Sequence, residues 1–189
     1  MNLLLFNKPF GVLSQFSAPA GESTAGQATL AQWIDAPDYY PAGRLDYHSE
    51  GLLLLTNNGA LQHRISHPGR KLPKHYWVMV EGHPDQSTMD TLRKGVALSD
   101  GMTKPARAKQ IVAPDLWAPD RQLPAYRLAH ASWLEIVLKE GRNRQIRRML
   151  AALGHPVLRL VRHQVGPWKL DNLQPGEMQF LNVNMPKRS

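Results

Sequence analysis

The chain has 189 residues, enough to bury a sizeable core in one domain, or in one domain with two lobes. It has no cysteine, which excludes a disulfide framework and a zinc site built on thiolates, and its formal net charge is +8. The apolar runs have the length of strands, well short of the ~20 residues that span a membrane, and no secretory signal pattern precedes them. We therefore expect a cytoplasmic protein.

Most of the excess positive charge falls in one segment. Residues 139–169 hold a single acid, Glu140, and eight basic residues: Lys139, Arg142, Arg144, Arg147, Arg148, Arg159, Arg162 and Lys169. Charge concentrated in this way is typical of a surface that faces a polyanion such as nucleic acid. The alternative, a basic face that only interacts with solvent, stays open at this point.

In the first half of the chain, short strands are expected at residues 3–6 and 12–15, followed by a Ser- and Gly-rich surface loop at 17–27. A short helix at 29–34, a buried strand at 52–55 and a helix at 59–66 that begins after Asn58 come next. Residues 67–74 read as a loop. Residues 75–81 are apolar on both faces, which predicts a central strand covered on two sides.

In the second half, a helix is expected at residues 86–94, with Asp85 as its N-cap and Gly95 at its end. Strands follow at 106–112 and 127–138, separated by a Pro-rich loop at 113–124. A helix at 143–154 has apolar residues at helical spacing, namely Ile146, Met149, Leu150 and Leu153. Strands at 157–165 and 178–183 end the chain.

The order of these elements predicts the fold class. Strands outnumber helices, and the helices are too few and too scattered for regular alternation of strand and helix. We expect an α+β fold with a mostly antiparallel sheet and flanking helices.

Asp46 is the first candidate for chemistry. It lies in a glycine-bounded loop, next to Arg44 and directly before a buried strand. A nearby cation keeps such a carboxylate ionised, so that it can act as a nucleophile or a general base. On local pattern alone, an aspartate that caps a turn of the loop is the favoured alternative.

Other groups complete the set of candidates. The motif at residues 140–149 joins a buried strand to the basic helix, whose arginines and N-terminus suit phosphates. Tyr76 begins a central strand and could stack on an extruded base, although a core tyrosine is the commoner case. His63 and His67 do not form a metal motif, and no phosphate-binding glycine motif is present, so neither a metal nor a nucleotide cofactor is expected.

The motifs resemble those of a known family. Residues 43–59 (GRLDYHSEGLLLLTNNG) are similar to the catalytic motif of bacterial ribosomal RNA pseudouridine synthases of the RsuA-like branch. Further similarities follow in register over residues 7 to about 180: N-K-P-x-G-V at 7–12, K-x-Y-x-V at 74–78, EGRNRQIRRM at 140–149, and Leu158 with Arg162 and Gly166. Asn58 departs from the aspartate common in relatives.

The resemblance implies a role for each matching residue. Asp46 would be the essential aspartate, either attacking the sugar C1′ or removing a ribose proton on a glycal route. Tyr76 would stack on the flipped uracil, Arg147 would pair with Asp46, and Leu158 would line the pocket. The residues expected to bind the RNA are Arg44, Arg142, Arg144, Arg148 and Arg162.

The resemblance also implies the organisation and partners of the protein. It suggests one two-lobed catalytic domain over residues 1–189 around a central cleft, without the RNA-binding domain of the ribosomal S4 type that most of the branch carries. The expected partner is a hairpin or stem of large-subunit ribosomal RNA. No metal or organic cofactor is implied, and a monomer is expected. The alternative is a non-catalytic RNA-binding or ribosome-assembly protein.

Overall fold

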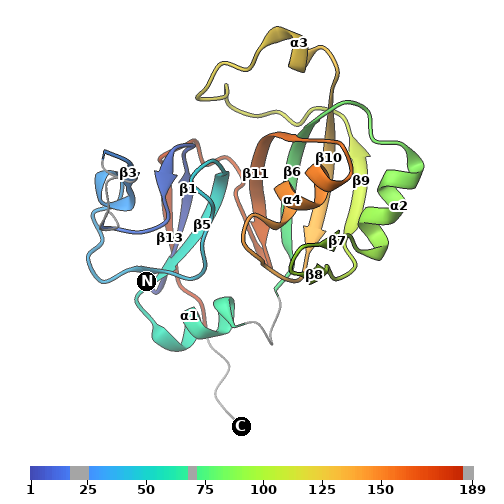
Figure 1. The fold of residues 1–189 in the computed structure, drawn as a ribbon. Helices are drawn as coiled ribbons and strands as arrows, with labels where there is room; N and C mark the ends of the chain where they lie inside the picture. Colours follow the sequence, from blue (N-terminus) through green and yellow to red (C-terminus); the bar gives the residue numbers. More distant parts are fainter. Residues whose placement is uncertain (18–25, 68–71, 185–189) are drawn as a thin grey trace. The chain divides into compact units, whose positions relative to one another are not determined.

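Two units make up the chain in this computed structural model, which describes residues 1–17, 26–67 and 72–184 (Figure 1). Unit 1 consists of Met1–Lys71 with Trp168–Ser189, and unit 2 consists of Leu72–Pro167. Most of the loop predicted at residues 17–27 and the middle of that at 67–74 lie outside the described residues.

Unit 1 is built on an antiparallel sheet. Its strands, in spatial order, are β13 (Met178–Leu181), β1 (Leu3–Lys8), β5 (Glu50–Thr56) and β4 (Tyr40–Pro41). Every residue of β1 and of β5 is buried. The unbroken leucine run of β5 is explained by this burial, because a strand covered on both faces does not alternate between apolar and polar residues.

Smaller elements complete unit 1. The helix α1 (Gly59–Ser66) begins as predicted, with the Asn58 side chain accepting a hydrogen bond from the Leu61 amide (3.0 Å). The short strands β2 (Val12–Leu13) and β3 (Ala28–Thr29) pair in parallel, and β12 comprises Trp168–Lys169.

The short helix predicted at residues 29–34 forms only in part, as the 3-10 helix η2 (Leu30–Gln32), and not as an α-helix. The segment before Pro37 is too short to offset the cost of nucleating an α-helix.

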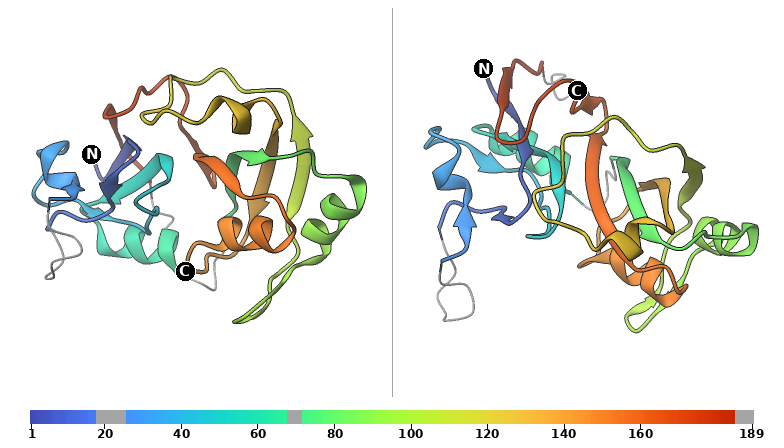
Figure 2. Two further views of the ribbon diagram at one scale, coloured as in Figure 1. Left: turned by 45° about the horizontal axis from the view of Figure 1, so that its top comes forward. Right: turned by 90° about the horizontal axis from the view of Figure 1, so that it is seen from above.

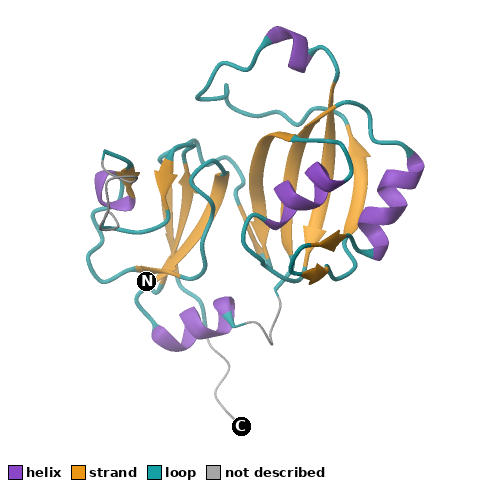
Figure 3. Cartoon of the chain, viewed as in Figure 1, coloured by secondary structure: helices purple, strands orange, loops and turns teal. Residues whose placement is uncertain are grey.

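Unit 2 is likewise built on antiparallel strands. Its strands, in spatial order, are β11 (Val157–Val165), β6 (Lys74–Glu81), β10 (Ala131–Leu138) and β9 (Arg107–Ile111). The helices α2 (Gln86–Lys94) and α4 (Gln145–Ala152) cover one face of this sheet (Figure 3). Their apolar residues and those of the strands form one core, which includes Val78, Met89, Leu134, Met149 and Leu160.

The strand β6 is central in unit 2, as predicted, but its two faces are covered unequally. Val78 and Val80 are buried in the core beneath the helices. Trp77 and Met79 point to the opposite face and are only half-buried. The apolar pattern thus identified the strand correctly and overestimated the cover on its second face.

The segment between β9 and β10 differs most from expectation. It contains a short helix, α3 (Ala125–Leu128), where a strand was predicted to begin at residue 127. Pro124 precedes the helix with φ of −57°, which favours a helical start. The loop stands away from the ends of β9 and β10 (Figure 2) and returns to β11, where Arg121 Nη2 donates to the Leu158 carbonyl (2.6 Å).

The α+β class with a mostly antiparallel sheet architecture is confirmed. The six strand pairs given above for unit 1 and unit 2 are all antiparallel. A small hairpin of β7 (Ala97–Leu98) and β8 (Gly101–Met102) adds a further antiparallel pair. None of the helices described is long and apolar enough to cross a membrane.

Candidate active site

Asp46 lies in the loop between β4 and β5 of unit 1, and its side chain is half-buried. The loop turns through a backbone hydrogen bond from the Ser49 amide to the Asp46 carbonyl (3.0 Å). Among the described residues of unit 1, no group donates a hydrogen bond to the Asp46 carboxylate. The turn-capping alternative requires such a bond. The carboxylate therefore has no structural role in its own loop, whereas the exposed Arg44 precedes it by two residues.

The N-terminal segment of the chain fixes the backbone on either side of Asp46. The Ser14 hydroxyl donates to the Leu45 carbonyl (2.8 Å) and accepts from the Leu45 amide (3.0 Å). The Gly11 amide donates to the Tyr47 carbonyl (2.9 Å). Both residues that flank Asp46 are thus bonded to the segment after β1, so the carboxylate is presented from an ordered loop.

Lys8 stabilises the same segment from within. Its side chain is fully buried, and its ammonium group donates to the carbonyls of Pro9 and Val12 (both 2.8 Å). These bonds close a turn in which Gly11 has φ of +72°, a conformation that favours glycine. The role of Lys8 and Ser14 was missed from the sequence, although the N-K-P-x-G motif was a signal for a special turn.

Replacing Ser14 by alanine is expected to lower catalytic turnover by about tenfold, because both hydrogen bonds to Leu45 are lost and Asp46 loses its fixed position. The measurement is turnover on RNA at a temperature where the variant is folded by circular dichroism. Ser66→Ala is the matched control, since this exposed serine of the same unit bonds only within α1. Wild-type turnover in Ser14→Ala would contradict the positioning of the loop.

Tyr76 and Arg162 lie opposite each other on neighbouring strands of unit 2, in the register of β6 with β11. Tyr76 is half-buried and packs against the core, whereas Arg162 is buried. Burial lowers the pKa of Lys74, two residues before Tyr76, and the Arg162 guanidinium lowers it further. Two cations are therefore close together beside an aromatic ring, an arrangement that favours an anionic ligand.

The start of β11 brings two further predicted residues together. Leu158 is buried, and the Arg147 guanidinium, from α4, donates to the carbonyl of the preceding residue, Val157 (3.4 Å). Arg147 lies beside the apolar stripe of α4, in which Ile146, Met149 and Leu150 are buried as predicted.

The basic segment of the sequence is not one continuous basic surface. Only Lys139, Arg144 and Lys169 of its eight cations are exposed. Arg142 and Arg148 take part in ion pairs with acids of unit 2, and Arg159 and Arg162 are buried. The sequence therefore overestimated the charge available to a polyanion.

Arg159 illustrates the difference. Its position on a strand of a basic segment suggested a phosphate contact at the surface. In the structure it is buried, with its guanidinium 5.5 Å from the centre of the Trp117 ring. We therefore assign Arg159 a packing role between β11 and the loop after β9.

One histidine cluster appears that the sequence did not predict. His75 and His163 lie 3.8 Å and 3.5 Å from the same carboxylate oxygen of Glu135. The three side chains are close enough together to bind one metal ion. The Lys109 ammonium already pairs with the other oxygen at 2.8 Å. Burial alone would raise the pKa of Glu135, but the Lys109 bond and the two histidines lower it. The acid is thus neutralised by protein groups, and we interpret the cluster as an ion-pair network.

The comparisons with known proteins agree with the motifs. The family described as RNA pseudouridylate synthase matches residues 2–152. Ribosomal large subunit pseudouridine synthase E of Xanthomonas campestris is 51% identical over 176 residues, covering 93% of this chain and 92% of the relative. The enzyme of the same name from Vibrio parahaemolyticus is 48% identical, covering 96% of this chain and 74% of its own.

A solved structure described as a pseudouridylate synthase has the same fold. It superposes with a TM-score of 0.76 at 28% identity, covering 96% of this chain and 70% of the other. An archaeal H/ACA Nop10–Cbf5 complex matches with a TM-score of 0.55 at 13% identity, which supports the fold alone. The resemblance seen in the motifs is confirmed: the chain belongs to the family of RNA pseudouridylate synthases.

Proposed function

We propose that this enzyme isomerises a specific uridine of large-subunit ribosomal RNA to pseudouridine, with Asp46 as its nucleophile or base. The observation that carries the proposal is the state of Asp46: no described residue of unit 1 donates a hydrogen bond to its carboxylate, although Ser14 and Gly11 fix the loop on both sides. A half-buried acid without a structural role is a candidate for chemistry.

The reaction needs no net transfer of atoms. The bond between N1 of uracil and C1′ of ribose breaks, the base rotates, and a bond between C5 and C1′ forms. The C5 proton is lost and N1 gains one, so uridine and pseudouridine have the same composition. Asp46 would either attack C1′ or remove a ribose proton, and Arg147 would pair with its carboxylate.

The remaining predicted residues would bind the flipped nucleotide. Tyr76 would stack on the uracil, and Leu158 would form the apolar wall beside it. Arg44 and Arg144 are exposed in the structure, and both would contact phosphates of the RNA. Arg162 and its neighbour Lys74 would supply buried positive charge next to Tyr76.

We further propose that residues 1–189 act as one catalytic domain, and that the enzyme works in the cytoplasm as a monomer on a hairpin or stem. The two named relatives above, which are large-subunit synthases, support the choice of RNA. Extracting a base from its stack costs a few kcal/mol, which phosphate contacts and stacking on the enzyme would offset.

The test is a mapping experiment. Large-subunit ribosomal RNA from cells that lack this protein is incubated with the purified chain, and pseudouridines are mapped before and after. We expect one new pseudouridine, absent when the protein is omitted. RNA binding without any new pseudouridine would instead support the non-catalytic alternative.

A further inference from the structure

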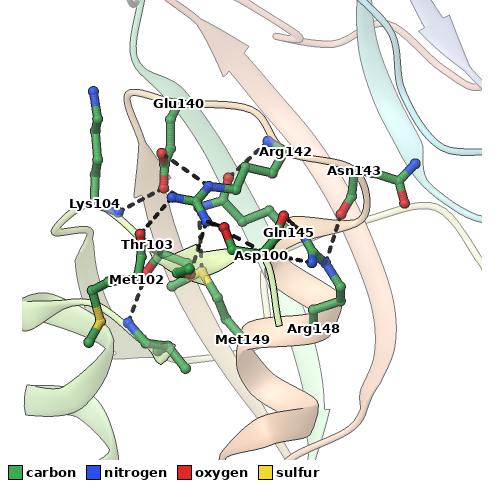
Figure 4. A network of polar contacts seen from close by, with 12 residues as sticks. Asp100, Met102, Thr103, Lys104, Glu140, Arg142, Asn143, Gln145, Arg148 and Met149 are labelled. Atoms are coloured by element: carbon green, nitrogen blue, oxygen red, sulfur yellow. Dashed lines mark hydrogen bonds and ion pairs between the residues drawn. The ribbon is translucent and has the colours of Figure 1, made fainter. Parts of the chain in front are cut away.

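Asp100 is the centre of a polar network in unit 2 that none of the motifs predicts (Figure 4). It lies at the turn of the hairpin formed by β7 and β8. Both of its carboxylate oxygens accept hydrogen bonds from the Arg148 guanidinium, at 2.8 Å and 3.0 Å. This two-pronged geometry gives arginine and carboxylate their strongest and most directional pairing. The Arg148 bonds lower the pKa of Asp100, so the acid is charged at neutral pH.

Arg142 binds the same hairpin through its backbone. Its guanidinium donates to the carbonyls of Gly101 (3.0 Å) and Met102 (2.6 Å), and it lies within ion-pair distance of Asp100 and Glu140 (3.6 Å each). Glu140 in turn accepts from the Lys104 amide (2.8 Å). The Arg142 guanidinium also donates to the Asp100 carbonyl (3.3 Å), so Arg142 contacts five groups of its own unit.

These contacts surround a backbone residue in an unusual conformation. Arg144, directly before α4, has φ of +46°, which costs a residue other than glycine about 1 kcal/mol or more. Arg148 Nε donates to the Asn143 carbonyl (2.9 Å), and the Arg142 amide donates to the Gln145 side chain (3.0 Å). Both bonded backbone groups precede Arg144, and the side chains that bind them belong to α4 (Gln145–Ala152).

The conformation of Arg144 determines where the helix begins. The sequence placed the helix start near Asn143, but α4 begins at Gln145 because Arg144 leaves the helical region. Arg144 is exposed at the apex of the bend, and Arg147 follows on α4. The bend therefore determines the directions in which the Arg144 and Arg147 side chains point.

We propose that Asp100 is a positioning residue, which binds Arg148 and Arg142 so that the bend presents Arg144 and Arg147 to the RNA. The inference rests on the proposed function and refines it: of the arginines at residues 142–148, Arg142 and Arg148 shape the site, Arg144 contacts the RNA, and Arg147 acts at the reacting nucleotide as the partner of Asp46.

A purely electrostatic role makes the opposite prediction. If Arg142 and Arg148 were phosphate ligands, Asp100 would only weaken binding by competing with the RNA for them. Removing its charge would then tighten binding and steepen its salt dependence, since each additional phosphate contact adds about 1 to the slope of log K against log salt. The sign of the change in affinity therefore separates the two roles.

The experiment compares Asp100→Asn and Arg148→Lys with wild type on an unmodified transcript of large-subunit ribosomal RNA. Arg148→Lys keeps the positive charge and loses the two-pronged bond. Turnover at saturating RNA and the Kd over a series of KCl concentrations are measured below the melting temperature of every variant. We expect turnover to fall about tenfold in both variants, with the Kd within about twofold of wild type.

The matched control is Asp90→Asn, which removes a similarly exposed acid from the same unit, where it pairs with Arg93 (2.7 Å). It should turn over at the wild-type rate. Wild-type turnover in Asp100→Asn together with tighter binding would overturn the positioning role alone. Absence of pseudouridine with the wild-type enzyme would instead count against the proposed function, because the reference activity itself would be missing.

Discussion

Replacing Asp46 by asparagine is expected to lower pseudouridine formation by about a thousandfold or more, because the amide can act neither as a nucleophile nor as a base at neutral pH. The substitution preserves the shape of the side chain. The carboxylate makes no hydrogen bond with the described residues of unit 1 that the amide would break, so the free energy of unfolding should change by less than about 0.5 kcal/mol. Turnover on the mapped RNA and thermal melting measure the two effects.

The control for Asp46→Asn is Asp35→Asn. Asp35 is an exposed acid of the same unit, so the control makes the same change in net charge outside the loop between β4 and β5. Its turnover should equal that of wild type, and RNA affinity should be similar in both variants. Pseudouridine formation by Asp46→Asn at even a tenth of the wild-type rate would exclude the proposed role of this carboxylate.

The elements predicted well from the sequence are those with strong local signals. The helix α2 has both predicted end residues: the Asp85 side chain accepts from the Thr88 amide (2.7 Å), and Gly95 follows the last turn with φ of +119°. The strands β6 and β11 combine length with apolar runs. In each case, the physical cause lies within a few residues of the element, where a pattern in the sequence can reveal it.

Sequence motifs suggested which residues belong to the candidate site, but not which other groups surround and bind them. The motifs led us to propose Asp46, Tyr76 and Arg147, whereas composition gave the eight cations of residues 139–169 a common role that the structure divides. Asp100 lies 48 residues from Arg148 along the chain, and Ser14 lies 31 residues from Leu45. Local periodicity contains no information about such partners, because the fold alone brings them together.

Local periodicity also could not distinguish the exposed cations of residues 139–169 from the buried ones. Arg159 and Arg162 lie on β11, where alternation alone does not show that both are buried. A β-bulge between Val157 and Arg159, and another between Arg162 and Gln164, shift the register of β11 against β6. Each extra residue changes which side chains share a face, so sequence spacing does not predict the face.

Replacing Arg147 by alanine is expected to lower turnover about a hundredfold, with at most a threefold change in the Kd for RNA. The proposed role of Arg147 is to pair with Asp46 at the reacting nucleotide, so its loss should affect the chemical step more than binding. Arg147→Lys should recover only part of the rate, because a lysine restores the charge without the planar set of donors. Single-turnover kinetics at saturating RNA isolate this step.

Arg93→Ala is the matched control for Arg147→Ala, since Arg93 is a half-exposed arginine on the other long helix of unit 2 and bonds to Asp90 and the Ala108 carbonyl. Its loss should lower stability modestly and leave turnover within about twofold of wild type at a temperature where the protein is folded. Arg159 is unsuitable for comparison because it is buried against Trp117. If Arg147→Ala weakened RNA binding and left the single-turnover rate unchanged, Arg147 would be a phosphate contact, and the partner of Asp46 would have to be sought elsewhere.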